Sequence, residues 1–440
     1  MTIDRISVYQ AVEVDVMDAG SPIAGSERNA DLVQARDAVF RVFVTLESGW
    51  TPREVSVRVQ LTTAGTEHTV FTRKTLNVDS EQSDLASTIQ VEADGDLIGP
   101  DTTYAVEIVE CETGPGGTVA SPRFPSEGAT ALEARPTGVL TIAFVPVQVD
   151  SWSPDTSEGA LQVYRDYLQA MYPISEITTS VANSVTTSSG FDWSVVLDQV
   201  RDRRAADSPP DDVYYYGLIR PAETLRDYCR GGCTTGMGYV TDVSRWAADY
   251  RAACGVAFAD EDSAVTMAHE VGHNHGREHS PCGVSGDPNY PYPEGGIGSW
   301  GYDARTGSLL DPARYADIMS YCSPVWVSDW TYQAFVERVA AVNGVTAQSL
   351  AITPTPTEQW YVLLMGPTGA HWGIPYRTAK PAFGTPASAR VLAEDGSAIT
   401  SVAVYATATS LPGVHSYLVP PPRAGWHSIE ISGGTPVVYP

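Results

Sequence analysis

Positive charge is scarce in this 440-residue sequence. Lysine and arginine together number 27, against 53 aspartate and glutamate residues, which gives a formal net charge of −26. A surface of this sign repels the phosphates of nucleic acids and the anionic headgroups of lipids. We therefore expect no nucleic-acid or anionic-membrane partner, and the simplest role of the charge is solubility.

Long apolar runs are absent as well. No stretch approaches the ~18 apolar residues that a membrane span requires, so no span is expected. The opening residues, MTIDRISVYQ, lack the basic segment followed by an apolar segment that marks an export signal. The composition nevertheless fits a secreted enzyme whose export signal is not present in this chain. At roughly 150 residues per domain, three domains are expected.

Histidine is rare but concentrated in one segment. Four of the eight histidines fall within residues 269–279, which read HEVGHNHGREH. His269 and His273 are four residues apart, so on a helix they share a face and can bind one metal ion. Glu270 can then reach a water molecule on that ion. The pattern predicts a metal-bearing helix with its own base.

The end of this segment supplies a third ligand. Gly276 is expected to end the helix, because glycine adopts the left-handed conformation at little cost. The reversal would bring His279 to the same ion. Three protein ligands leave a fourth position open, which is typical of a catalytic zinc ion. His275 lies two positions from His273, points elsewhere, and is expected to face solvent.

The eleven-residue pattern HExxHxxGxxH resembles that of the metzincin zinc endopeptidases. These enzymes carry a methionine turn, and the segment DIMSY at 317–321 places Met319 40 residues after His279. The resemblance implies that Met319 packs under the metal and that Tyr321 matches the tyrosine beside the zinc in astacin-like and serralysin-like members. Ser280 matches matrixins instead. The segments HSPCG and WVSDWTY are closer to bacterial secreted metzincins of the gametolysin-like or mucin-cleaving kinds.

The six cysteines allow up to three disulfides. The resemblance brings together the segments that follow the third histidine and the methionine turn, and so favours a disulfide between Cys282 and Cys322. Cys229 and Cys233, in CRGGC, can close a tight loop, although either can instead pair with Cys254. Zinc ligation by cysteine is the weaker alternative, because the three histidines already supply a catalytic site.

The flanking segments have the pattern of all-β domains. Residues 1–112 contain short runs of β-branched and aromatic residues between turn residues, which is typical of an antiparallel β-sandwich. Residues 113–138, rich in Gly, Pro, Ser and Ala, are expected to be a linker. Residues 359–440 return to short strands and predict a second, smaller β-sandwich.

The middle segment, residues 139–345, alternates strands with helices. The apolar run Val139–Val149 suits a buried strand, and Ser157–Met171 has helical periodicity. Asp262 or Ser263 is expected to cap the histidine-bearing helix. The order of elements predicts a mixed, mostly parallel sheet with an active-site helix. With the resemblance, it predicts a metzincin-like α/β catalytic domain flanked by two β-sandwich-like domains.

Three further segments bear on the site. The resemblance implies that the strand near Gly236–Val240 is the antiparallel edge that pairs with an extended peptide, although a plain hairpin fits equally. Residues 289–303, dense in aromatics, Pro and Gly, predict an Ω-loop, or a loop that shapes a substrate pocket. A helix from about Asp329 to Val342 should follow. Calcium is possible but unsupported, because four aspartates match no calcium-loop spacing: Asp287, Asp303, Asp311 and Asp317.

These features predict a secreted zinc metalloendopeptidase that hydrolyses protein or glycoprotein substrates. Zinc on His269, His273 and His279 would lower the pKa of its water towards ~7. Glu270 would accept the water's proton and pass it to the leaving amine, and Tyr321 would hydrogen-bond the oxyanion. One alternative is a surface-binding or glycan-binding protein with an inactive zinc core and glycans on its β domains. The other is a zinc hydrolase of non-protein amides. Intact Glu270 argues against an inactive core.

Overall fold

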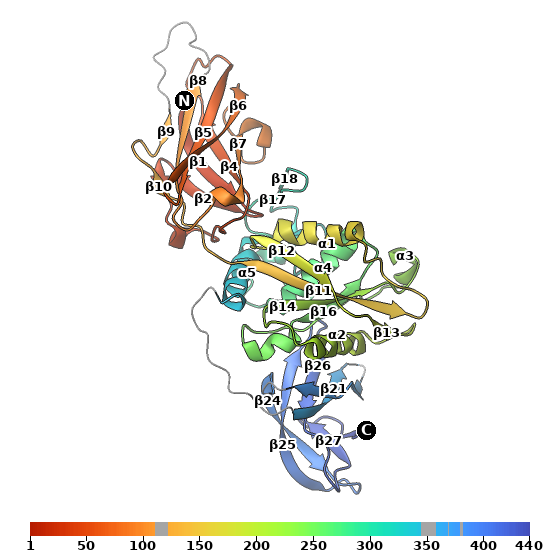
Figure 1. Cartoon of the computed structure of the whole chain (residues 1–440). Helices are drawn as coiled ribbons and strands as arrows, with labels where there is room; N and C mark the ends of the chain where they lie inside the picture. The colour runs from red at the N-terminus through yellow and green to blue at the C-terminus, as the bar shows by residue number, and fades with distance from the viewer. Residues whose placement is uncertain (111–121, 345–357, 368, 379–381) are drawn as a thin grey trace. The chain divides into compact units, whose positions relative to one another are not determined.

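The computed structural model describes residues 1–110, 122–344, 358–367, 369–378 and 382–440 (Figure 1). The chain forms two compact units, each assembled from segments that are distant in sequence. The first contains Met1–Val139, Leu168–Ile177 and His279–Thr346, and the second contains Leu140–Tyr167, Thr178–Glu278 and Ala347–Pro440.

Two antiparallel sheets form the N-terminal part of the first unit. Their strand orders are β3-β2-β1-β4-β7 and β10-β8-β5-β6, with β9 paired to β8. In β5, Val55, Val57 and Val59 are fully buried while Glu54 and Arg58 are exposed, which follows the period-two pattern of a half-buried strand. The strands are β1 (Thr2–Tyr9), β2 (Glu13–Asp18), β3 (Ser21–Pro22), β4 (Ala38–Thr45), β5 (Arg53–Thr63), β6 (Thr66–Leu76), β7 (Ile89–Ala93), β8 (Thr103–Glu110), β9 (Arg123–Phe124) and β10 (Thr130–Ala131).

Part of the expected linker is ordered in this unit. The strands β9 and β10 fall within residues 113–138 and both pair with β8, so this stretch extends the second sheet. Residues 113–121 of the expected linker lie outside the described residues.

Residues 279–344 of the first unit contain short ladders and helix α5 (Asp329–Val342), whose bounds match those expected from the sequence. Ser328 caps α5, because its side chain accepts from the Thr331 amide. At the other end, the side chain of Asn343 donates to the Thr137 carbonyl oxygen at 2.8 Å. The ladders pair β17 (Gly301–Asp303) with β18 (Ser308–Leu310), and β19 (Ala316–Asp317) with β20 (Val325–Trp326).

A mostly parallel sheet organises the second unit, with the strand order β12-β11-β14-β16-β15. The pairs β11–β14 and β14–β16 are parallel, whereas β15 is antiparallel to β16 and last in the order. The strands are β11 (Val139–Val149), β12 (Glu176–Val181), β13 (Val185–Thr187), β14 (Val213–Ile219), β15 (Gly236–Gly238) and β16 (Ala252–Val256). The helices are α1 (Glu158–Met171), α2 (Trp193–Asp207), α3 (Leu225–Tyr228) and α4 (Glu261–Asn274).

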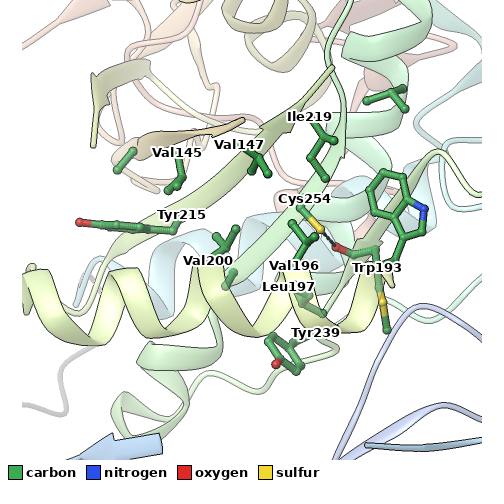
Figure 2. Close-up of a cluster of buried hydrophobic side chains, with 14 of the residues drawn as sticks. Val145, Val147, Trp193, Val196, Leu197, Val200, Tyr215, Ile219, Tyr239 and Cys254 are labelled. Atoms are coloured by element: carbon green, nitrogen blue, oxygen red, sulfur yellow. Dashed lines mark hydrogen bonds between the residues drawn. The ribbon is translucent and has the colours of Figure 1, made fainter. Parts of the chain in front are cut away.

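Helices α2 and α4 pack on opposite faces of this sheet. Figure 2 shows the cluster on the α2 face, where Val196 and Val200 of α2 meet Val147 of β11 and Cys254 of β16. Met237 of β15 belongs to this cluster. Its two glycine neighbours in β15 lie against α4, as the alternation of side chains along a strand requires.

The C-terminal part of the second unit is one antiparallel sheet, eight-stranded within the described residues. Its order is β22-β21-β26-β25-β24-β27-β28, with β23 paired to β21. Buried residues of this sheet form two small clusters, one of which also contacts Ala205 of α2. The strands are β21 (Glu358–Gly366), β22 (Gly369–Trp372), β23 (Tyr376–Thr378), β24 (Thr385–Leu392), β25 (Ala398–Ala408), β26 (His415–Val419), β27 (Ser428–Ile431) and β28 (Val437–Val438).

Candidate metal centre

Helix α4 carries the first two histidines of the motif. Asp260 caps it, because its carboxylate accepts from the Ser263 amide at 2.9 Å. The expectation that Asp262 or Ser263 would be the cap is therefore wrong. The helix ends at Asn274, and Gly276 follows with a φ of +82°, the left-handed conformation that glycine favours.

His269 and His273 face each other one turn apart on α4. Their Nε2 atoms are 3.1 Å apart. Two nitrogens that bind one tetrahedral zinc ion at about 2.0–2.1 Å lie roughly 3.3 Å apart, so this spacing suits a shared ion. Nδ1 of His273 is 2.6 Å from the Arg277 carbonyl oxygen, which can only accept. Nδ1 therefore carries the proton and Nε2 offers its lone pair.

His279 joins these two residues in the structure. Each of the three histidines offers a ring nitrogen, and the three atoms lie within 4.8 Å of one another. All three side chains are buried. Neutral imidazoles at this spacing form a donor set that suits zinc and other divalent transition metals. The residues present therefore fit a metal ion.

His275 does not face solvent, contrary to expectation. Its ring stacks on Tyr214 of β14, with centroids 4.7 Å apart and planes 4° from parallel. Nδ1 of His275 lies 2.8 Å from the Val271 carbonyl oxygen one turn earlier. The face of α4 away from the histidine ligands packs on the sheet, so a residue there is buried. His275 thus stabilises the end of the helix.

The segments that follow His279 and Met319 are tied side by side. The amide of Ser280 donates to the Met319 carbonyl oxygen at 3.0 Å, and that of Tyr321 to Cys282 at 2.9 Å. A disulfide joins Cys282 to Cys322, the pair that the resemblance favours. The side chain of Met319 is buried. A second disulfide closes the CRGGC loop between Cys229 and Cys233, and Cys254 is a buried free thiol.

Tyr321 packs directly on one of the histidines. Its ring meets the ring of His279 edge-on, with centroids 4.8 Å apart. Tyr321 is 53% exposed. This position beside a metal-binding imidazole suits a hydrogen-bond donor to a substrate oxygen.

Glu270 is a residue of α4, and both its side chain and its backbone pack closely against strand β15. A Cβ atom on Gly236 would lie 2.7 Å from Glu270 Cγ and Oε1, and one on Gly238 would lie 2.8 Å from the Glu270 carbonyl oxygen. Only glycine permits this approach. Burial raises the pKa of the Glu270 carboxyl to about 8 in the metal-free chain, and a hydrogen bond from Ser410 lowers it. A cation at the histidines would lower this pKa further.

Two polar residues anchor the end of α4 and were not anticipated. The side-chain amide of Asn274 donates to the carbonyl oxygens of Tyr239 and Ala252, both at 2.9 Å. The Thr241 hydroxyl donates to the Asn274 carbonyl oxygen at 2.6 Å. These bonds fix the histidine-bearing helix against the chain that continues β15 and against β16. The asparagine inside the motif, HEVGHN, is the sequence signal that could have indicated such an anchor.

The aromatic loop at 289–303 is held largely by its own tyrosines and by α5. The Tyr290 hydroxyl donates to the Gly296 carbonyl oxygen at 2.7 Å, and the Tyr292 hydroxyl to Asp329 at 2.6 Å. All four aspartates considered for calcium have protein partners. Asp287 accepts from the Asn289 amide at 2.8 Å, and Asp311 accepts from the Ala313 amide at 2.9 Å. Asp303 pairs with Arg305, and Asp317 accepts from the amides of Met319 and Ser328. The metal-ligand cluster found among the described residues is the histidine one.

Comparison with known proteins agrees with this centre. The sequence model of the peptidase M66 family matches residues 249–325, a range that contains α4, all three histidines, Met319 and Tyr321. A comparison with curated proteins gave no match. No helix in the described part of the chain is both long and apolar enough to cross a membrane. The family match and the buried histidine cluster together support a metallopeptidase.

Proposed function

We propose that this chain is a secreted, zinc-dependent endopeptidase with a metzincin-like catalytic domain. The observation that carries the proposal is the cluster of three buried histidines whose ring nitrogens lie within 4.8 Å of one another, with Glu270 beside the first. The peptidase family match covers this same segment. The two disulfides support secretion, because such bonds persist in oxidising compartments.

His269, His273 and His279 would hold the zinc ion, which when bound supplies a Lewis acid that activates water and polarises the scissile carbonyl. Glu270 accepts the proton of the attacking water and then passes it to the leaving amine. Its buried position strengthens it as a base, since desolvation makes the carboxylate hold a proton more tightly. Tyr321 donates a hydrogen bond to the oxyanion of the tetrahedral intermediate.

The proposed substrate is a protein or glycoprotein in extended conformation. Strand β15 is antiparallel to its neighbour and last in the sheet, and it lies against Glu270. Because Ser410 already bonds to the amide and the carbonyl oxygen of Gly238, an extended peptide would add at the start of the strand, near Gly236, where main-chain hydrogen bonds would align it beside the base. Glycan contacts through the flanking β domains are part of the same proposal.

The test is a digest of mixed proteins and glycoproteins, analysed by mass spectrometry. We expect new peptide termini that a chelator abolishes and added zinc restores, and that Glu270→Gln does not produce. Glycoprotein binding without cleavage would replace the proposal with the binding-module alternative. Release of products from non-protein amides alone would replace it with the second alternative.

A further inference from the structure

Strand β15 has an inner edge that pairs with β16 and an outer edge on the opposite side. Thr235, just before the strand, and Tyr239, just after it, form backbone hydrogen bonds to β16. Because backbone groups alternate in direction along a strand, those of Gly236, Gly238 and Val240 face the outer edge. The outer edge is where an extended peptide can add to the sheet.

A loop of the C-terminal sheet already occupies part of this outer edge. The loop comprises residues 409–414, joins β25 to β26, and is called the edge loop below. The Ser410 amide donates to the Gly238 carbonyl oxygen at 2.8 Å, and the Gly238 amide donates to Ser410 Oγ at 3.0 Å. The Val240 amide donates to the carbonyl oxygen of Ala408, the last residue of β25, at 3.0 Å. The outer edge is therefore filled from Gly238 onward.

The edge loop is fixed by its own hydrogen bonds and by packing. The Thr409 amide donates to the Val414 carbonyl oxygen at 3.3 Å, and the Val414 amide donates to the Leu411 carbonyl oxygen at 3.1 Å. Leu411 and Val414 also pack on the apolar cluster between α2 and the sheet, to which Met237 of β15 belongs. Thr409 and Ser410 are buried. A peptide that displaced the loop would have to break all of these contacts.

The start of β15 differs from its end in this respect. Within the described residues, the edge loop forms hydrogen bonds with Gly238 and none with Gly236. Gly236 is also the position where a Cβ atom would lie 2.7 Å from the side chain of Glu270. The part of the outer edge that the loop does not fill therefore lies beside the proposed base.

The direction of the edge loop indicates the direction of a peptide on the same edge. The bridge between Tyr239 and Thr409 is antiparallel, and antiparallel pairs outnumber parallel ones about two- to three-fold in proteins. A peptide that pairs with Gly236 in this direction has its N-terminal side towards Ser410. Its C-terminal side runs past the start of β15. The edge loop thus lies on the N-terminal side of the cleaved bond.

We propose that the edge loop is a specificity-determining element that limits how many substrate residues can pair with β15 on the N-terminal side of the cleaved bond. The inference rests on the proposed function, because it concerns the substrate of the same site. Peptide residues opposite Gly236 and Met237 can pair, whereas Ser410 takes the next position. The preferred substrate is a chain that begins, or turns away from the sheet, one or two residues before the cleaved bond.

The first experiment is a peptide-length series with the wild-type protein. A peptide that the protein cleaves is lengthened one residue at a time, on the N-terminal side of the cleaved bond in one series and on the C-terminal side in the other. Each added main-chain hydrogen bond to the strand should raise kcat/KM by about 2- to 10-fold. We expect the rise to end after one or two residues on the N-terminal side and to continue further on the C-terminal side.

The second experiment replaces the edge loop, residues 409–414, with Asn-Gly. Ala408 and His415 already pair across the hairpin, and Asn-Gly favours the two-residue turn that joins paired strands. The replacement removes Ser410 from the outer edge and keeps the C-terminal sheet. Additional N-terminal residues should then each raise kcat/KM by about 2- to 10-fold. The control is Pro412→Ala, at an exposed position of the same loop, which should keep the wild-type dependence on length.

The outcomes separate the inference from the proposed function. A wild-type kcat/KM that keeps rising beyond the second N-terminal residue would overturn the inference, as would a limit on the C-terminal side instead. A folded, zinc-loaded loop variant with the wild-type dependence on length would overturn it too; if that variant does not fold, the wild-type series decides alone. A wild type that cleaves no peptide refutes the proposed function, and the inference with it.

Discussion

Two glycines of β15 make a prediction that separates damage to the base from damage to the metal-bearing helix. In Gly236→Ala the new methyl group would lie 2.7 Å from Cγ and Oε1 of Glu270 and 2.8 Å from Cγ2 of Thr266. Those atoms belong to side chains, so the carboxylate moves and the helix stays. In Gly238→Ala the methyl group would lie 2.8 Å from the Glu270 backbone oxygen, so α4 itself must shift.

The two variants should therefore fail differently. Overpacking against a rigid backbone costs about 1–3 kcal/mol, so Gly238→Ala should lose that much free energy of unfolding. For a unit of this size the loss corresponds to a drop in melting temperature of roughly 2–12 °C. Its zinc affinity should fall as well, because His269 and His273 move with α4. Gly236→Ala should keep zinc and most of its stability but lose kcat.

Calorimetry, zinc content and peptidase kinetics on the same preparations check this prediction. Gly231→Ala is the matched control, because a Cβ atom there would meet no other atom within 4 Å. Wild-type melting temperature, zinc content and kcat in both β15 variants would refute the close packing of α4 on β15. If Gly236→Ala lost zinc and Gly238→Ala kept it, the assignment of the Gly236 contact to the Glu270 side chain and of the Gly238 contact to the α4 backbone would be refuted.

Three further predictions follow from the centre. His279→Ala should bind zinc much more weakly while circular dichroism shows the helices intact, and wild-type zinc affinity would contradict the three-histidine centre. Tyr321→Phe keeps the ring on His279 but removes the hydroxyl, so kcat should fall by about 10²–10³ with little change in KM; unchanged kcat would remove the oxyanion role. Replacing Cys282 and Cys322 by serine opens a loop of 40 residues and should cost about 4 kcal/mol in denaturant unfolding, a loss that wild-type stability would contradict.

The motif was predictable because its information is local. The spacing of His269 and His273 on one helix face, the helix end at Gly276 and the bounds of α5 all follow from short-range periodicity and backbone preference. The position of the cap of α4 does not follow from such local patterns. Ala259, between the end of β16 at Val256 and the cap residue Asp260, adopts a left-handed φ of 55° and turns the chain there. Alanine gives no sequence signal for that conformation, so the helix begins earlier than expected.

The contacts around Glu270 were less predictable because they join distant parts of the chain. His275 is buried by Tyr214, a residue of β14 about 60 positions earlier. Ser410 lies between β25 and β26 of the C-terminal sheet, and no pattern in the sequence around it indicates that it lies near α4. The alternating glycines of GMGYV were a usable signal, since glycine at every second position indicates a strand with one face in very close contact. The identity of the contacting element was not readable from them.

The most direct test of the account is the activity of Glu270→Gln. This variant retains a side chain of the same shape and leaves the three histidines unchanged, so it should bind zinc as the wild type does. Loss of the proton acceptor should lower kcat by about 10²–10⁴. This loss should exceed the loss in Tyr321→Phe, which should retain measurable activity. A zinc-loaded Glu270→Gln protein that cleaves protein substrates at the wild-type rate would contradict the proposed peptidase mechanism.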